Sequence, residues 1–118
     1  MAPTERDSDS RRAQLVKGLA EMALLAVLRD GPRYGLELLE RLHDDAGLEV
    51  ADGTIYPLLH RLERAELVRS EWQTETENGR PRKYYALTRS GRAELDTMLE
   101  EWRALRKKLD RLTDGGKR

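Results

Sequence analysis

Hydrophobic residues recur every three or four positions in four segments of the chain, a spacing typical of helices with one buried face. The clearest segment is residues 52–67, where apolar residues follow the order i, i+3, i+4 and i+7 at Ile55, Leu58, Leu59 and Leu62. The other side of this segment is polar, aromatic or basic. We therefore predict a short helix with one apolar face and one exposed face.

Two helices are predicted before this one. The first covers residues 11–29 and is stopped by Asp30-Gly31-Pro32, because proline cannot continue the helical hydrogen bonds. The second covers residues 34–45 and is stopped by Gly47, with an inward side formed by Leu36, Leu39 and Leu42. Asp52 is the expected N-cap of the third helix, since its carboxylate can accept hydrogen bonds from the free N–H groups.

A pair of strands is predicted after the three helices. Residues 67–76 and 82–87 contain β-branched and aromatic residues among polar ones, and Asn78-Gly79 between them is a strong hairpin signal. Three helices followed by a hairpin form a winged helix-turn-helix. The predicted fold class is therefore mainly α with a β-hairpin wing (α+β).

The last predicted helix, residues 90–112 with Thr88 as its cap, carries an apolar seam. Its members are spaced alternately three and four residues apart, as in a coiled coil: Leu95, Met98, Trp102, Leu105, Leu109 and Leu112. A helix about 30 Å long outruns its own domain, so we expect it to form a homodimer. The alternative is that it packs on the first helix of the same chain. The domain boundaries that follow are a mobile tail over 1–10, the winged helix over 11–88, a dimerisation helix over 89–112 and a tail over 113–118.

Composition narrows the class of protein. The 118 residues suffice for one small domain, and no cysteine is available for disulfides, thiolate catalysis or a metal site. No metal or other cofactor is predicted. The absence of a long apolar run and of a secretory signal favours a cytoplasmic protein without a membrane partner. The two histidines lie on different predicted elements, and no phosphate-binding or nucleophile motif is present. We therefore do not expect an enzyme.

Charge is segregated even though the net charge is zero. Residues 78–92 contain five basic residues and no acid, whereas residues 35–52 are predominantly acidic. Phosphate binding depends on a local basic face rather than on the sum of charges. The pattern is compatible with nucleic-acid binding, and equally with an ordinary solvated surface.

An ordered set of motifs in residues 15–102 resembles the PadR family of bacterial transcriptional regulators. It comprises Leu24-Leu25 through Leu28, Gly31-Pro32, Tyr34-Gly35, 53–59, 61–63, Leu67-Val68, 79–88 and Gly91. The single C-terminal helix is similar to the shorter PadR subclass. The resemblance implies a homodimeric repressor whose third helix enters the major groove, while the wing reaches the neighbouring minor groove or backbone. It also implies an inverted-repeat operator, often of the ATGT…ACAT kind, which suits a two-fold dimer.

Candidate DNA contacts lie on the third helix and on the wing. Tyr56 is placed to touch a thymine methyl or a phosphate, or else to pack under the wing. Thr54 can meet phosphate at the helix N-terminus or simply cap the helix. His60 is a base or phosphate contact or a solvated side chain, and Arg61 is a phosphate contact. The full set is Tyr34, Thr54, Tyr56, Pro57, His60, Arg61, Arg80, Arg82 and Lys83.

Two reservations apply to the wing. A basic turn is often only solvated, although its place after this helix favours phosphate or minor-groove contact. Strand alternation also puts Arg82 and Lys83 on opposite faces, so we do not expect both to touch DNA.

Trp102 carries a ligand hypothesis. The resemblance implies an aromatic residue on the last helix that faces its symmetry mate across a pocket, and Trp102 falls at the matching position. Such a site would stack a small planar aromatic inducer, with Met98, Leu15 and Leu19 as further lining residues. The alternative is that Trp102 fills the dimer core. For the whole protein, the alternative function is a winged helix that binds another protein without sequence-specific DNA binding.

Overall fold

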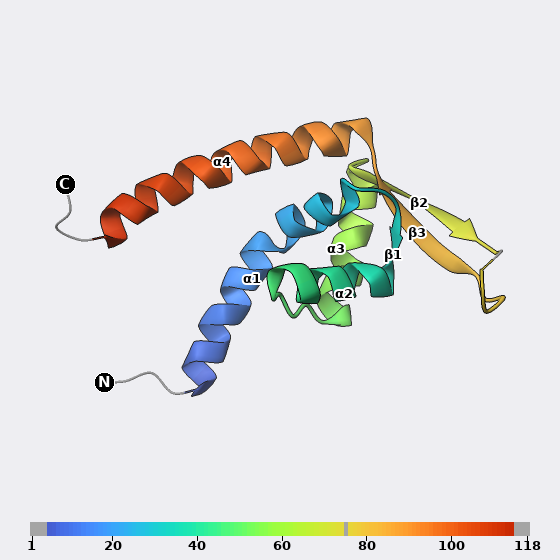
Figure 1. Ribbon diagram of the computed structural model, residues 1–118, viewed down its shortest axis with the longest axis horizontal. Coiled ribbons are helices and arrows are strands. Elements are labelled where there is room, and N and C mark those ends of the chain that lie inside the picture. Colours follow the sequence, from blue (N-terminus) through green and yellow to red (C-terminus); the bar gives the residue numbers. More distant parts are fainter. Residues whose placement is uncertain (1–4, 75, 115–118) are drawn as a thin grey trace.

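The computed structural model describes residues 5–74 and 76–114 and, within these ranges, the side chains from Ser10 onward. The elements follow the order α1 (Glu5–Leu28), β1 (Arg33–Tyr34), α2 (Gly35–Ala46), α3 (Asp52–Arg64), β2 (Val68–Gln73), β3 (Arg82–Leu87) and α4 (Arg89–Thr113). Figure 1 shows α1 and α4 as two long arms that spread apart toward the chain termini, with α2 and α3 beside α1 and the hairpin at the opposite end of the molecule. The predicted fold class, an α+β winged helix with an added C-terminal helix, is confirmed.

Helix α1 begins earlier than its hydrophobic pattern indicated. It starts at Glu5, so residues 5–10, which the pattern assigned to a mobile tail, are helical. A helix that has been nucleated can extend over residues with nothing to bury, because each further residue adds a backbone hydrogen bond. The helix ends at Leu28, ahead of the predicted stop at Asp30-Gly31-Pro32, with Gly31 at φ 145°. Residues 1–4 and 115–118 of the two predicted tails lie outside the described residues.

Helix α2 faces the core differently from the prediction. Leu38 and Leu42 are buried, whereas Leu36 is exposed, so its predicted inward position was wrong. Leu36 precedes Leu38 by two residues, and about 100° of rotation per residue places the two side chains on opposite sides of the helix. The predicted stop is correct, because Gly47 adopts a left-handed conformation with φ 65° and its N–H bonds to the carbonyl groups of Leu42 and His43.

The start of α3 also differs from the prediction. Ala51, in an extended conformation, is the N-cap, and Asp52 lies in the first helical turn without a capping hydrogen bond. The predicted capping by Asp52 was therefore wrong. Its carboxylate still lies at the positive end of the helix dipole, where an acid is favourable.

A three-stranded antiparallel sheet in the order β1-β3-β2 packs against the helices. Tyr34 of β1 pairs with Tyr84, which in turn pairs with Glu71 of β2. The two-residue β1 was not predicted, because two residues are too short to show alternation. The hairpin turn falls at Asn78-Gly79, where the Gly79 N–H bonds to the Thr76 carbonyl at 3.0 Å. β2 ends at Gln73 rather than Thr76, so the connecting loop is longer than predicted.

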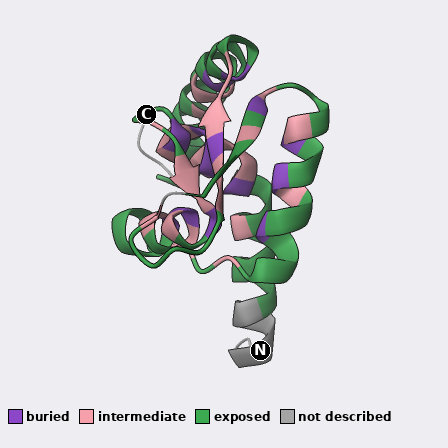
Figure 2. Cartoon of the chain, turned by 90° about the vertical axis from the view of Figure 1, so that its right-hand side faces the viewer, coloured by how far each residue is buried: buried purple, intermediate pink, exposed green. Residues whose placement is uncertain are grey.

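One aliphatic core holds these elements together. Figure 2 shows that the buried positions gather where the helices meet the sheet. The core comprises Leu24, Leu25, Leu28, Leu38, Leu42, Ile55, Leu59, Leu62, Val68, Tyr85 and Leu95. Every described element except β1 contributes to it, which is the mark of a single domain.

Helix α4 leaves this core soon after it begins. Thr88 is its N-cap, as predicted, with Oγ1 accepting from the Gly91 N–H at 2.9 Å. Leu95 is fully buried, whereas Leu105, Leu109 and Leu112 further along the seam are exposed. None of the described helices is long and apolar enough to cross a membrane.

Candidate nucleic-acid interface

Helix α3 presents a polar and aromatic face away from the core. Ile55, Leu59 and Leu62 turn inward. The exposed positions include all five residues that the sequence predicted for this helix: Thr54, Tyr56, Pro57, His60 and Arg61. The side chains on this face can donate hydrogen bonds, contact apolar groups or neutralise phosphate, which are the functions that base and backbone recognition require.

Tyr56 packs against the start of α2 while remaining partly exposed. A Cβ atom built on Gly35 would lie 2.5 Å from the Tyr56 Oη and 2.9 Å from the ring, so any larger residue at this position would have to displace the tyrosine ring. The side chain is 40% exposed. Tyr56 therefore packs against α2 rather than only under the wing, and its exposed part leaves the contact with DNA a prediction.

Arg61 leans toward α1. Its Nη2 lies 3.2 Å from Oε2 of Glu21, and both side chains keep access to water. This ion pair joins α3 to α1 across 40 residues of sequence. Arg61 is thus on the flank of the exposed face, and its guanidinium already has an acidic partner.

Arg82 of the wing is held by aromatic side chains on the outer face of the sheet. Its guanidinium carbon lies 4.4 Å from the centre of the Tyr34 ring, and Tyr34 meets Tyr84 edge to face at 5.5 Å. A guanidinium stacked in this way keeps its N–H edge available for a phosphate. Tyr34 therefore supports a wing cation, a role that the sequence did not indicate.

Lys83 lies on the other side of β3, as strand alternation predicted. Its Nζ is 3.9 Å from a carboxylate oxygen of Glu63 and 5.7 Å from the centre of the Tyr85 ring. Ser70 of β2 donates a hydrogen bond to the same Glu63 carboxylate. Glu63 at the end of α3 thereby contacts both wing strands. The sequence around Glu63 does not predict this role, because Ser70 and Lys83 lie 7 and 20 residues further along the chain.

Tyr85 forms the floor of this region. It is only 4% exposed. Burial raises the pKa of its phenol, and the nearby Glu63 carboxylate and Tyr56 raise it further. Tyr85 therefore stays neutral throughout the physiological range and acts as a packing residue.

A crevice of about 330 Å³ opens between the start of α2, the exposed face of α3 and the wing. Aromatic, aliphatic and basic side chains surround it: Tyr34, Gly35, Leu36, Tyr56, Trp72, Arg82, Lys83 and Tyr85. Sequence reasoning did not name Leu36 or Trp72 as site residues. Trp72 pairs with Lys83 across the hairpin, and this register is set by the packed strands rather than by a local sequence signal.

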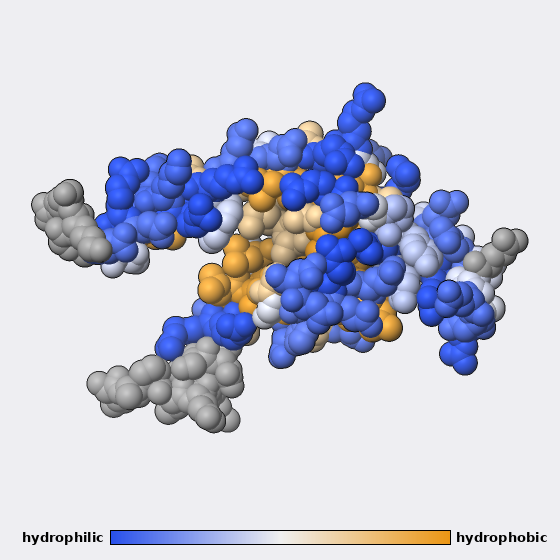
Figure 3. All heavy atoms as spheres, viewed as in Figure 1, coloured by the Kyte–Doolittle hydropathy of each residue, from blue (hydrophilic) through white to orange (hydrophobic). Residues whose placement is uncertain are grey.

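The two arms enclose a second apolar surface. Figure 3 shows hydrophobic residues gathered in the notch between α1 and α4, with hydrophilic residues on the outer sides of the arms. Met98 packs against the core, and Trp102 and Leu19 are half-buried. Leu15 and the far part of the α4 seam, Leu105, Leu109 and Leu112, are exposed.

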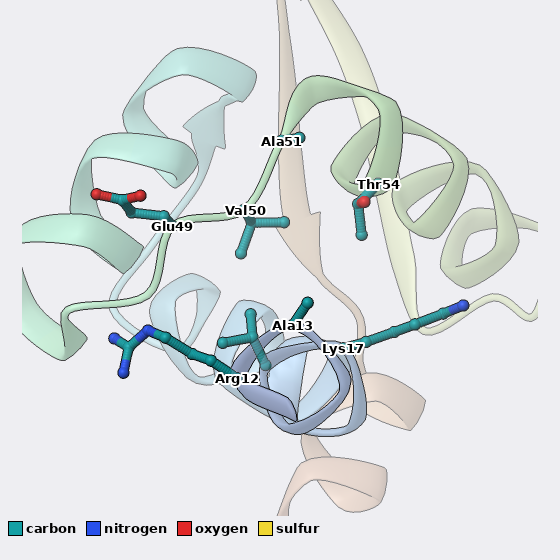
Figure 4. A pocket seen from close by; sticks show the side chains of 8 residues that line it. Arg12, Ala13, Lys17, Glu49, Val50, Ala51 and Thr54 are labelled. Atoms are coloured by element: carbon teal, nitrogen blue, oxygen red, sulfur yellow. The ribbon is translucent and has the colours of Figure 1, made fainter. Parts of the chain in front are cut away.

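A further pocket of about 560 Å³ lies between α1 and the loop before α3. Val50 and Ala13 point into it, while Arg12 and Lys17 extend away in opposite directions (Figure 4). Arg12 donates to the Gly47 carbonyl at 3.1 Å, and Thr54 lies on the rim. Within residues 5–74 and 76–114 no three potential metal ligands cluster together.

Comparison with known proteins gives a consistent result. Residues 24–97 match the family described as the transcriptional regulator PadR-like family. A PadR-like transcription factor structure from Bacteroides fragilis is 34% identical and superimposes with a TM-score of 0.70, covering 87% of this chain and 98% of that one. A PadR family regulator from Eggerthella lenta is also 34% identical, with a TM-score of 0.77 over 92% of this chain and 90% of that one. A PadR-like regulator from Bacillus cereus is 29% identical, with a TM-score of 0.77 over 86% and 98%.

Proposed function

The chain belongs to the PadR-like family of transcriptional regulators, and from this premise we propose that it binds an inverted-repeat operator as a homodimer and represses transcription. The family consists of DNA-binding regulators rather than enzymes, in agreement with the expectation from the sequence. The cytoplasm, where bacterial operators are accessible, is the compartment that this function requires.

The observation that carries the proposal is the exposed face of α3 beside a basic wing. The diameter of an α-helix matches the major groove, and a hairpin next to it reaches the adjacent minor groove or backbone. Tyr56, Pro57 and His60 are the candidates for base edges. Thr54 and Tyr34 are the candidates for the backbone near helix N-termini.

The wing supplies most of the electrostatic anchoring in this proposal. Arg80 lies in the exposed turn, and Arg82 is held by stacking on Tyr34. Lys83 and Arg61 have carboxylate neighbours in Glu63 and Glu21, so each gives less to a phosphate contact unless its partner releases it.

The homodimer rests on the notch between α1 and α4. The exposed side chains on the α4 seam are Leu105, Leu109 and Leu112. In a two-fold dimer the same seam of a second copy would pack against them. A dimer presents two α3 helices to two half-sites, which accounts for an inverted repeat.

The ligand hypothesis for Trp102 belongs to the same surface. Trp102, Met98 and Leu19 are half-buried and Leu15 is exposed. If these residues meet across the two-fold axis, two copies would form an aromatic-lined site for a small planar inducer. Binding of such a molecule would change the spacing of the two α3 helices and release the operator. The alternative occupant is the partner subunit's own apolar seam.

A footprint tests the proposed function directly. The purified protein is incubated with the promoters of its own gene and the neighbouring genes at two salt concentrations. We expect protection of an inverted repeat that weakens steeply as salt rises, because phosphate contacts release counterions. Protection indifferent to sequence, or none at all, contradicts the proposal and favours the winged helix as a protein-binding module.

Replacing Tyr56 tests the assignment of the reading helix. Tyr56→Ala should weaken operator binding about tenfold, since a good base contact is worth about 1–3 kcal/mol. Tyr56→Phe keeps the aromatic ring beside Gly35 and removes only the hydroxyl, and His43→Ala on α2 is the remote control. Operator affinity equal to the parent in Tyr56→Ala would show that α3 does not read DNA.

A further inference from the structure

Large exposed hydrophobic side chains fall into two groups among the described residues. Four lie on the α1 and α4 arms, where a second copy of the chain accounts for them: Leu15, Leu105, Leu109 and Leu112. The other three surround the crevice at the opposite end of the molecule, with Leu36 54%, Tyr56 40% and Trp72 63% exposed. The notch between the arms is remote from this second group, so the dimer does not account for it (Figure 1).

The crevice combines this apolar rim with positive charge. Trp72 on β2 pairs in register with Lys83 on β3, and Arg82 stacks on Tyr34 at its edge. Exposed apolar patches of this kind mark binding sites. A purely apolar partner would leave the Arg82 guanidinium without an anion, and a free inorganic anion would leave Trp72 and Leu36 exposed to water.

One polymer strand carries both kinds of group at short, regular intervals. A deoxyribose–phosphate backbone alternates an apolar sugar face with a negative phosphate. The crevice is also continuous with the exposed face of α3 through Tyr56, so a duplex on that face would bring one strand past it.

We propose that this crevice receives the sugar–phosphate strand between the major groove read by α3 and the groove reached by the wing. Trp72 and Leu36 pack on successive deoxyribose rings, and Arg82 faces the intervening phosphate. This inference rests on the proposed function, and it adds Trp72 and Leu36 to the DNA-contacting residues as positioning groups.

Affinity measurements with matched variants test the inference. The probe is a duplex that the parent protein selects from a randomised pool, with an unrelated duplex of equal length for comparison. Trp72→Ala and Leu36→Ala should each weaken binding about fivefold, and Trp72→Phe should restore most of the loss. Gln73→Ala, next to Trp72 on the opposite face of β2, should bind as the parent does.

The salt dependence separates apolar from ionic contacts. Loss of a sugar contact releases no counterion, so Trp72→Ala should leave the slope of log affinity against log salt unchanged. Loss of a phosphate contact in Arg82→Ala should make that slope shallower by about one. A merely structural defect in the wing would change both affinity and slope in Trp72→Ala.

Tryptophan fluorescence tests the contact between Trp72 and DNA independently of the affinity measurements. The chain has two tryptophans, Trp72 and Trp102, and the difference between the parent and Trp72→Phe isolates the emission of Trp72. Free Trp72 should be quenched readily by acrylamide, and a saturating amount of the selected duplex should protect it.

The outcomes distinguish the inference from the function beneath it. If the parent binds the selected duplex but Trp72→Ala and Leu36→Ala bind equally well and Trp72 stays quenchable, the inference is wrong and the proposed function stands. If 2-naphthoate protects Trp72 and competes with the duplex, the crevice is an effector site instead. If the parent selects no duplex, the proposed function itself fails.

Discussion

Gly91, in the first turn of α4, lies so close to the chain before β2 that its hydrogen cannot be replaced. A Cβ at this position would collide with the backbone carbonyl of Leu67 and with the Leu87 side chain. The Thr88 hydroxyl, which accepts from the Gly91 N–H, also donates to the Glu66 carbonyl at 2.6 Å. These contacts set where α4 leaves the core.

Gly91→Ala should therefore lower the free energy of unfolding by about 2–3 kcal/mol, because a backbone atom must move to admit the methyl group. The control is Gly18→Ala in α1, where a Cβ would meet nothing within 4 Å, and which should raise stability by up to about 1 kcal/mol through helix propensity. Urea unfolding of both variants gives the measurement. Equal stabilities would show that α4 can shift freely.

The buried Tyr85 predicts a pH dependence of stability. Its pKa is raised in the folded protein, so the unfolded chain loses its phenolic proton first as pH rises. Stability is therefore fully present below the ordinary tyrosine pKa of about 10 and falls as pH rises through and beyond that value. Tyr85→Phe should reduce the loss of folding stability at alkaline pH, and Tyr84→Phe should not. Thermal unfolding between neutral pH and the alkaline range measures it.

At the scale of elements, the ion pair between α1 and α3 couples the arm to the exposed helix. Glu21 holds Arg61 at 3.2 Å, so in the free protein it competes with any phosphate for the guanidinium. Both side chains keep solvent access, which limits the pair to about 0.2–1 kcal/mol.

Glu21→Gln should accordingly tighten duplex binding about twofold, whereas Arg61→Ala should weaken it and flatten its salt dependence. Glu40→Gln on α2 removes the same charge without touching Arg61, and it should change affinity less. Fluorescence anisotropy at two salt concentrations provides the comparison. An identical gain in Glu40→Gln would mean that only net charge matters.

Most of the secondary-structure elements can be identified from the local sequence pattern. The four helices, the two hairpin strands and the Thr88 cap all depend on spacing or on residues a few positions apart. The short β1 exists only because β3 lies beside it, and its two residues have no pattern of their own. The exposure of Leu36 depends on which side of α2 packs against the rest of the chain, and tertiary packing decides this rather than local preference.

At the scale of the whole molecule, two candidate interaction surfaces lie at opposite ends. The arms present the apolar notch, and the far end presents α3, the crevice and the wing. If the notch is the dimer interface, charge placed on the α4 seam must separate the subunits without unfolding the domain, because Leu105 and Leu109 are already exposed in the single chain.

Leu105→Glu combined with Leu109→Glu should convert a dimer into a folded monomer and reduce operator binding by at least about tenfold. Arg103→Glu, on the opposite side of α4, should leave the dimer intact. Sedimentation measures the oligomeric state of both variants, and circular dichroism shows whether they are folded. A parent that is monomeric at micromolar concentration would contradict the dimer outright.

Some residues of the candidate interface could be predicted from the sequence, and others could not. Tyr56 and the basic wing could be recognised from sequence because amphipathic spacing separates exposed from buried positions, and the Asn78-Gly79 turn locates the wing. Trp72 and Leu36 could not, because an exposed hydrophobic residue has no distinctive local signal. Glu63 and Glu21 act through partners on other elements, and such pairs depend on how the elements pack.

The chain by itself determined its helices, its hairpin and its aliphatic core, because these follow from periodicity, turn chemistry and burial of leucine over short distances. Tertiary structure decided how α4 leaves the core, which cations have acidic partners, and that Leu36, Tyr56 and Trp72 meet around one crevice. Those features arise from contacts between residues far apart in sequence, and only the packed arrangement of the elements sets their distances.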